Sequence, residues 1–147
     1  MGLELNAKVK ITRVMNAVAV GTTTQTGSEV DMAGFDGVRF IALLGAITDG
    51  TPSLKAQQDV VTGMAGAADL ANTGVTVAAT DDNKAIVLDI KRPVERFLRP
   101  VIVRGGTTGC VIDGIIAEQY GADTAPIAHA TSVAGSETHV SPAEGTA

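Results

Sequence analysis

The chain has 147 residues, of which 45% are hydrophobic and only 3% aromatic, so one folded domain would need a core of Val, Ile, Leu and Ala. The net charge of −5 and an isoelectric point near 4.8 argue against a nucleic-acid partner, because phosphate contacts need clustered Lys and Arg. A single cysteine, Cys110, excludes an internal disulfide, and no apolar stretch approaches the roughly 20 residues of a membrane span, so we expect no membrane partner.

Eight short apolar runs follow one another along the chain, separated by residues typical of turns. Such a series predicts an all-β, antiparallel β-sandwich or barrel. Turn residues at 48–50, 81–83 and 105–109 support this prediction. The runs cover residues 16–21, 28–32, 35–45, 53–58, 74–80, 84–90, 96–105 and 110–119.

Two of these runs are apolar on both faces of the predicted strand. In residues 38–44, Ile41 and Leu43 face away from the main apolar row, and in residues 97–104 Val101 and Val103 do so. We therefore consider these four residues candidates for a self-association surface. The alternative is that both segments are central strands beneath a loop.

Residues 57–74 hold the best helix candidate. Val60, Val61, Met64 and Ala67 recur at roughly helical spacing, although Gly63 and Gly66 weaken a helix. A loop with one irregular helical turn is an equal alternative.

The stretch 91–104 concentrates five of the eleven basic residues of an acidic chain. It predicts either a solvated strand face or a basic stripe that docks on an acidic protein surface. Pro93 and Pro100 suggest that part of the stretch is a sheet edge. The docking candidates are Lys91, Arg92, Arg96, Arg99 and Arg104.

No pattern of catalytic or metal-binding residues stands out, and we predict no catalytic, cofactor or metal site and no enzyme activity. His129 and His139 have no second ligand at metal-binding spacing. Residues 105–109 could hold an anion on backbone N–H groups, but a tight turn between two strands explains them better. Cys110 reads as a small buried hydrophobe.

The last nineteen residues, 129–147, contain only two bulky apolar side chains. Such a segment cannot form a core, so we divide the chain into a sandwich domain (1–128) and an extended C-terminal arm (129–147) that reaches beyond the domain. Its anchors would be Val133, Val140 and Pro142. The alternative is a disordered end without a role.

Residues 34–58, 82–105 and the closing 141–147 (SPAEGTA) together resemble the capsid cement or decoration proteins of tailed phages. The resemblance implies a jelly-roll-like sandwich on the outer capsid surface of the virion, assembled in the host cytoplasm. It also implies two partners, the phage major capsid protein and a second copy of the chain. A homodimer is favoured and a trimer is possible.

A carbohydrate-binding or tail-associated β-sandwich module of a phage is the alternative function. Sugar sites usually use aromatic platforms, and this chain has three Phe, one Tyr and no Trp.

Overall fold

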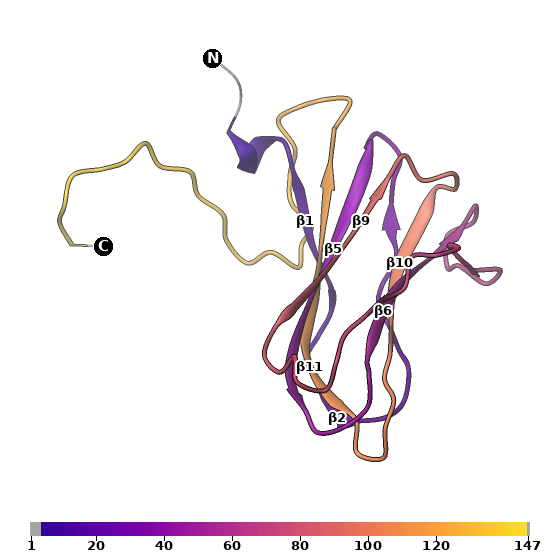
Figure 1. Ribbon diagram of the computed structural model, residues 1–147. Helices are drawn as coiled ribbons and strands as arrows, with labels where there is room; N and C mark the ends of the chain where they lie inside the picture. The colour runs from indigo at the N-terminus through magenta and orange to yellow at the C-terminus, as the bar shows by residue number, and fades with distance from the viewer. Residues whose placement is uncertain (1–3, 147) are drawn as a thin grey trace.

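The computed structural model describes residues 4–146 and is almost entirely β-structure, arranged as two sheets that face each other (Figure 1). After one short 3-10 turn, η1 (Leu5–Ala7), all regular elements are strands. Within the described residues, no helix is long and apolar enough to cross a membrane. Sheet A contains β1 (Lys10–Met15), β2 (Val18–Gly21), β5 (Gly37–Ile47), β9 (Ala85–Lys91) and β11 (Cys110–Tyr120). Sheet B contains β3 (Gln25–Thr26), β4 (Val30–Asp31), β6 (Ser53–Asp59), β7 (Ala68–Asp69), β8 (Val75–Thr76) and β10 (Phe97–Val103).

The strand order is that of a jelly roll. Sheet A runs β1-β11-β5-β9 and sheet B runs β3-β10-β6-β7, with β4 also beside β10 and β8 also beside β6. If β1–β2, β3–β4 and β7–β8 are each counted as one interrupted strand, the first strand pairs with the last, the second with the seventh, the third with the sixth and the fourth with the fifth. All these pairs are antiparallel. This nested pairing is produced when an antiparallel ribbon rolls into two sheets, which confirms the predicted jelly-roll-like sandwich.

Strict alternation of side chains builds the core between the sheets. In β9, the buried Ile86, Leu88 and Ile90 alternate with exposed neighbours, as predicted. In β5, Phe40 is fully buried within the inward row. Because successive strand residues point to opposite faces, one face of each sheet supplies the core and the other is left for solvent or a partner.

Pro100 lies in a central strand, so the predicted edge is wrong for this residue. β10 has β6 on one side and β3 with β4 on the other. The Pro100 carbonyl accepts from Gly27 N–H (2.8 Å) in the gap between β3 and β4, and the backbone N of an extended residue points to the same side as its carbonyl. The missing N–H donor therefore falls where the neighbouring strand is interrupted, and no ladder bond is lost.

Residues 57–74 are not a helix. The alternative, a loop with one irregular helical turn, is correct in part, because the segment is mostly loop but contains the short strand β7 (Ala68–Asp69) and no helical turn. The segment completes β6 and then makes turns in which Gly63 and Met64 have φ values of +85° and +49°. These left-handed conformations are incompatible with a continuous right-handed helix. The helical spacing of the apolar residues came from two valines at the end of a strand followed by small residues in a loop.

Candidate interaction surfaces

The five basic residues of the predicted stripe do not lie on one surface. Arg104 is buried, with 6% of its surface exposed. Its guanidinium donates to the backbone carbonyls of Ala19 (2.8 Å), Thr23 (2.8 Å) and Cys110 (2.9 Å). This side chain ties the end of β10 to β2 and β11, so it is unavailable for docking.

Arg96 and Arg99 reach the surface but are bound to neighbours. Arg96 donates two hydrogen bonds to the carboxylate of Asp31 (2.8 and 2.7 Å) and lies over the Phe97 ring, 5.2 Å from its centroid. The hydrogen bond from Arg96 lowers the pKa of Asp31. Arg99 donates to Gln57 Oε1 (2.9 Å). Because both guanidinium groups already have partners, they contribute less unpaired charge than the sequence suggests.

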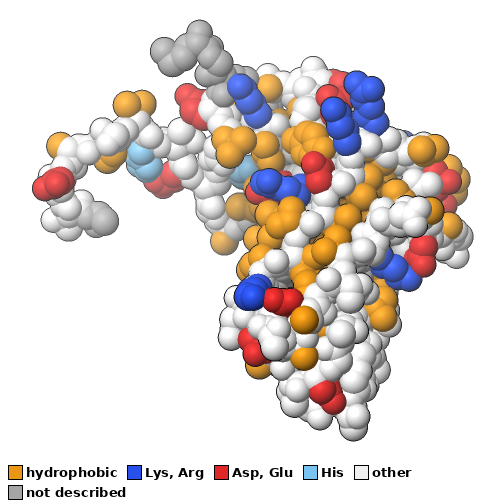
Figure 2. Space-filling view, in the orientation of Figure 1, with side chains coloured by type: hydrophobic (Ala, Val, Ile, Leu, Met, Phe, Trp, Pro, Cys, Tyr) orange, Lys and Arg blue, Asp and Glu red, His pale blue; other side chains and the backbone are white. Residues whose placement is uncertain are grey.

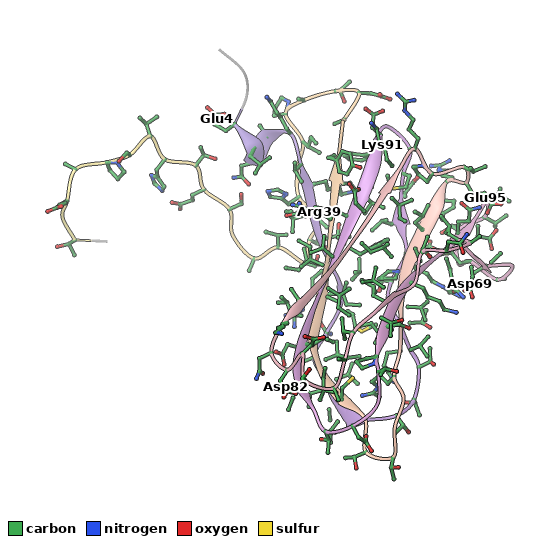
Figure 3. All side chains as sticks on the ribbon, in the orientation of Figure 1. Glu4, Arg39, Asp69, Asp82, Lys91 and Glu95 are labelled. Carbon is green, nitrogen blue, oxygen red and sulfur yellow. The ribbon has the colours of Figure 1, made fainter. Side chains whose placement is uncertain are left out.

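Lys91 and Arg92 remain exposed, and neither forms an ion pair within residues 4–146. Lys91 lies at the end of the sandwich opposite Asp82 (Figure 3), and Arg92 follows it in the chain. With Arg96, Lys91 and Arg92 form what we call the basic corner. An open pocket of about 350 Å³ adjoins it, and the apolar Phe35 and Val94 line this pocket together with the acidic Asp36 and Glu95. The corner combines positive charge with an apolar surface, which suits contact with an acidic protein surface.

Exposed valines at the same end were not identified as surface residues from the sequence. Val60 and Val61 are 65% and 59% exposed, and Val94 is 91% exposed. Val60 follows Asp59, the β6 residue that pairs with Phe97 at the start of β10, so these loops lie beside the basic corner. The only sequence signal was that two large apolar residues precede a glycine-containing loop.

The four self-association candidates lie on opposite sides of the molecule. Ile41 and Leu43 are on the outer face of sheet A, where Leu43 is 42% exposed. Val101 and Val103 are on the outer face of sheet B, and Val101 is only 2% exposed. One contact cannot use all four residues, and Val101 has almost no surface to offer.

Sheet A presents the more apolar outer face. Cross-strand pairing places Ile116, Ile41 and Val87 in one row, and Val87 is 51% exposed. Hydrophobic side chains gather over β5 and β9 in Figure 2. We call this set, with Leu43, the sheet A patch.

A polar row borders the sheet A patch. Arg39 forms an ion pair with Glu118, with Nε 2.8 Å from the carboxylate. The Tyr120 hydroxyl donates to Asp89 (2.7 Å), and burial together with this hydrogen bond raises the pKa of Tyr120 to about 12. An apolar centre beside satisfied polar groups is the usual composition of a protein interface.

The start of the arm binds its own domain along the free side of β1. Ile11 N–H donates to His129 Nδ1 (3.1 Å), Ala130 N–H donates to the Ile11 carbonyl (3.1 Å), and Arg13 N–H donates to Ser132 Oγ (2.9 Å). The His129 and Ser132 side chains thus take the place of strand carbonyls. This docked segment (127–133) covers an edge that would otherwise be open to strand pairing.

Beyond the docked segment, the distal arm (134–146) leaves the sandwich (Figure 1). Asn6 donates to Ser136 Oγ (2.5 Å) and Thr138 Oγ1 (3.3 Å), and every described residue of the distal arm is exposed. Of the predicted anchors, Val133 is half-buried in a groove of about 250 Å³ on the outer side of sheet A. Val140 is 95% exposed and Pro142 is exposed.

The loop at residues 105–109 does bind an anion, which belongs to the chain itself. The Asp49 carboxylate accepts from the N–H groups of Thr107 (2.8 Å), Thr108 (3.0 Å) and Gly109 (2.6 Å). These bonds, led by the one from Gly109, lower the pKa of Asp49. Gly109 has a φ of +82°, and a Cβ there would lie 2.0 Å from the Gly21 carbonyl oxygen. The loop is therefore a structural turn, and it joins strands of different sheets.

Cys110 is buried, and both histidine side chains contact polar neighbours. Cys110 is 1% exposed, and burial raises the pKa of its thiol. His129 Nε2 lies 2.6 Å from Asn6 Oδ1, and His139 Nε2 lies 2.8 Å from Glu137. No three His, Cys, Asp or Glu residues between positions 4 and 146 come together as a possible metal site.

Comparison with known proteins identifies no relative of established function. No protein-family model matches the chain, and no curated protein matches it. A solved structure from Bacillus endospore appendages, described as disulfide-linked pili, aligns with a TM-score of 0.43 and 14% identity. That alignment covers 82% of this chain and 96% of the other. A similarity this weak carries no argument about function.

Proposed function

We propose that this chain is a structural phage head protein that binds the outer surface of the capsid in the virion and stabilises it by clamping neighbouring major capsid subunits. The observation that carries the proposal is the exposed arm on a closed jelly roll. An arm of mostly small and polar residues cannot offset its own ordering entropy, about 1–2 kcal/mol per residue for the backbone. Contacts with other molecules must supply the stabilisation when it orders.

In this function, each of the three exposed surfaces makes a different contact. The basic corner and its neighbouring valines dock on the major capsid protein, and charge orients the approach. The sheet A patch joins two copies, since a closed twofold dimer is the commonest way to cover such a face; a trimer is the second arrangement. The distal arm extends the contact to a further subunit.

The aromatic side chains give less support to the carbohydrate-binding or tail-associated alternative. Phe40 is fully buried, and Phe35, Phe97 and Tyr120 are half-buried. Sugar rings stack on exposed aromatic faces, and each of these four side chains is at least half-buried.

Co-sedimentation with phage heads tests the proposal. Heads assembled from the major capsid protein of the same genome, but lacking this chain, would be mixed with the purified protein and pelleted. We expect the protein to pellet with the heads and to raise the temperature at which they rupture. Absence of the wild-type protein from the pellet would overturn the proposed function.

The docking surface is tested with Arg92→Glu in the basic corner. We expect lower occupancy on heads, and we expect the loss to shrink as salt is raised. Lys8→Glu is the matched control, because Lys8 is an exposed lysine near the N-terminus and is not part of the corner. Equal occupancy for the two variants at low salt would exclude the corner as the docking surface.

A further inference from the structure

Sheet A has one covered edge, at β1, and one open edge, at β9. β1 is covered by the docked segment, whereas β9 has β5 as its only strand partner among residues 4–146. The Lys84 carbonyl accepts from Leu44 N–H (3.0 Å), and Arg92 N–H donates to the Asp36 carbonyl (2.7 Å). The backbone groups of the even-numbered residues therefore form hydrogen bonds with β5. The alternation of an antiparallel ladder then leaves odd-numbered backbone groups pointing outward, and no described residue bonds to them. These outward groups belong to Ala85, Val87, Asp89 and Lys91.

An open edge of this length can accept another strand, and its charges restrict which one. Lys84, which precedes β9 and forms an ion pair with Asp81 (2.8 Å), and Lys91, the last residue of β9, flank the strand, and Asp89 lies between them. Charged side chains on an edge discourage pairing with strands that do not offer opposite charges. A segment with acidic groups seven residues apart would complement both lysines.

The distal arm carries this spacing. Glu137 and Glu144 are seven residues apart, as are Lys84 and Lys91. We propose that the distal arm of a second copy adds to β9 as an antiparallel strand, with Glu137 opposite Lys91 and Glu144 opposite Lys84. The same register places His139 opposite Asp89.

The position of Pro142 independently agrees with this register. Residues 137, 139, 141 and 143 of the arm would exchange backbone hydrogen bonds with β9, and Pro142 would lie opposite Ile86, between the bonded positions. Its missing N–H would then face away from β9, where an edge strand tolerates proline. A shift of one residue would place Pro142 opposite an outward-bonding residue and would also break the charge pairs.

The same register gives Val140 a place in the core. Val140 would lie opposite Leu88, whose side chain points inward, and residues paired directly across an antiparallel ladder share a face. The side chain that is 95% exposed on the arm would extend the edge of the hydrophobic core.

The arm cannot reach its own β9 in this register. Ser132 is fixed at β1, and five residues from there to Glu137 span at most about 18 Å. The site beyond β9 is five strand spacings from the docked segment, about 24 Å. The arm must therefore come from another copy. This inference does not depend on capsid binding. Lys91 belongs both to the basic corner and to the paired positions, whereas Arg92, which tests the corner, lies outside the paired positions.

Disulfide trapping between two purified variants tests the inference without heads. Val87→Cys and Ser141→Cys would be mixed and oxidised, because directly opposed Cα atoms lie about 5.5 Å apart, within disulfide range. The buried Cys110 does not compete. The register control is Val87→Cys mixed with Gly145→Cys, because Gly145 is an exposed arm residue beyond the paired positions 137–144. We expect the mixed disulfide for Val87 with Ser141 at least about tenfold above the control.

A second pair and a charge exchange protect the test from variants that fold poorly. Ala85→Cys with Ala143→Cys occupies the same register and should also cross-link. Glu137→Lys and Lys91→Glu should each weaken self-association, and the combination should restore it. Equal yields for the matched and control pairs would overturn the inference, as would cross-linking only within a single chain that carries both cysteines.

Discussion

Two polar side chains, Asp49 and Arg104, stabilise the turns at one end of the sandwich by binding backbone groups. The Asp49 carboxylate accepts from three successive N–H groups, and the Arg104 guanidinium donates to three carbonyls. Backbone groups that a turn leaves without strand partners need such substitutes. The sequence marked both residues, but as members of a turn and of a docking stripe, because all their partners except Cys110 lie 58 to 85 positions away along the chain.

We predict that Asp49→Asn lowers the stability of the domain at neutral pH. The pKa of Asp49 is below its ordinary value of 3.8, so the ionised carboxylate stabilises the folded state above that value. This contribution is lost as the pH falls through the lower pKa of the folded state. Urea unfolding between pH 7 and pH 2 should show a gap between wild type and variant that closes in acid.

The control for that measurement is Asp123→Asn. Asp123 is exposed, and no hydrogen bond to its carboxylate is found within the described residues. A wild-type-like unfolding curve for Asp49→Asn at pH 7 would contradict the role assigned to the carboxylate.

Arg104→Met should destabilise the fold by about 2–4 kcal/mol, because it leaves buried carbonyl groups without donors. Arg99→Met should cost about 1 kcal/mol or less, since Arg99 makes one hydrogen bond, to Gln57. Chemical denaturation of the two variants measures the difference. Wild-type stability for Arg104→Met would show that the three hydrogen bonds to backbone carbonyls do not stabilise the fold.

At the scale of elements, the docked segment behaves as a substitute for an edge strand. We predict that a chain ending after Ala134 keeps wild-type thermal stability, whereas one ending after Ala128 melts at a lower temperature and aggregates. The shorter chain loses the partners of Ile11 and Arg13 and exposes the β1 edge. Thermal unfolding followed by light scattering compares them.

The chain that ends after Ala134 also separates the contribution of the docked segment from that of the distal arm. It retains the bonds of His129 and Ser132 and removes the distal arm, so a loss of self-association would then report on the distal arm alone. Identical melting and scattering for both truncations would show that the docked segment does not protect β1.

The strands themselves were largely predictable, because alternation is a local property. The inward row of β9, Ile86, Leu88 and Ile90, follows directly from the sequence pattern. The central position of Pro100 in sheet B could not be predicted from the sequence pattern, because it depends on a gap between β3 and β4 more than 70 residues earlier in the chain. Whether residues 57–74 would form a helix also depended on more than spacing, since glycine and small residues permitted a loop.

At the scale of the whole molecule, the jelly roll decides which predicted surface residues can act together. β5 lies in sheet A and β10 in sheet B, so Leu43 and Val103 point away from each other on opposite outer faces. Sequence patterns identified both strands as apolar on two faces, but not the sheet to which each belongs. That assignment depends on pairing between strands that are distant in the chain.

The last prediction concerns the proposed contact between copies through the sheet A patch. Leu43→Asp should weaken dimerisation by more than tenfold, because burying a leucine contributes about 1.5–3 kcal/mol and each 1.4 kcal/mol corresponds to a factor of ten in affinity. Val103→Asp on sheet B is the matched control and should leave the association unchanged. Analytical ultracentrifugation of both variants, made in a chain ending after Ala134, isolates the patch from the distal arm. A monomeric truncated chain at high concentration would assign self-association to the arm and exclude the patch.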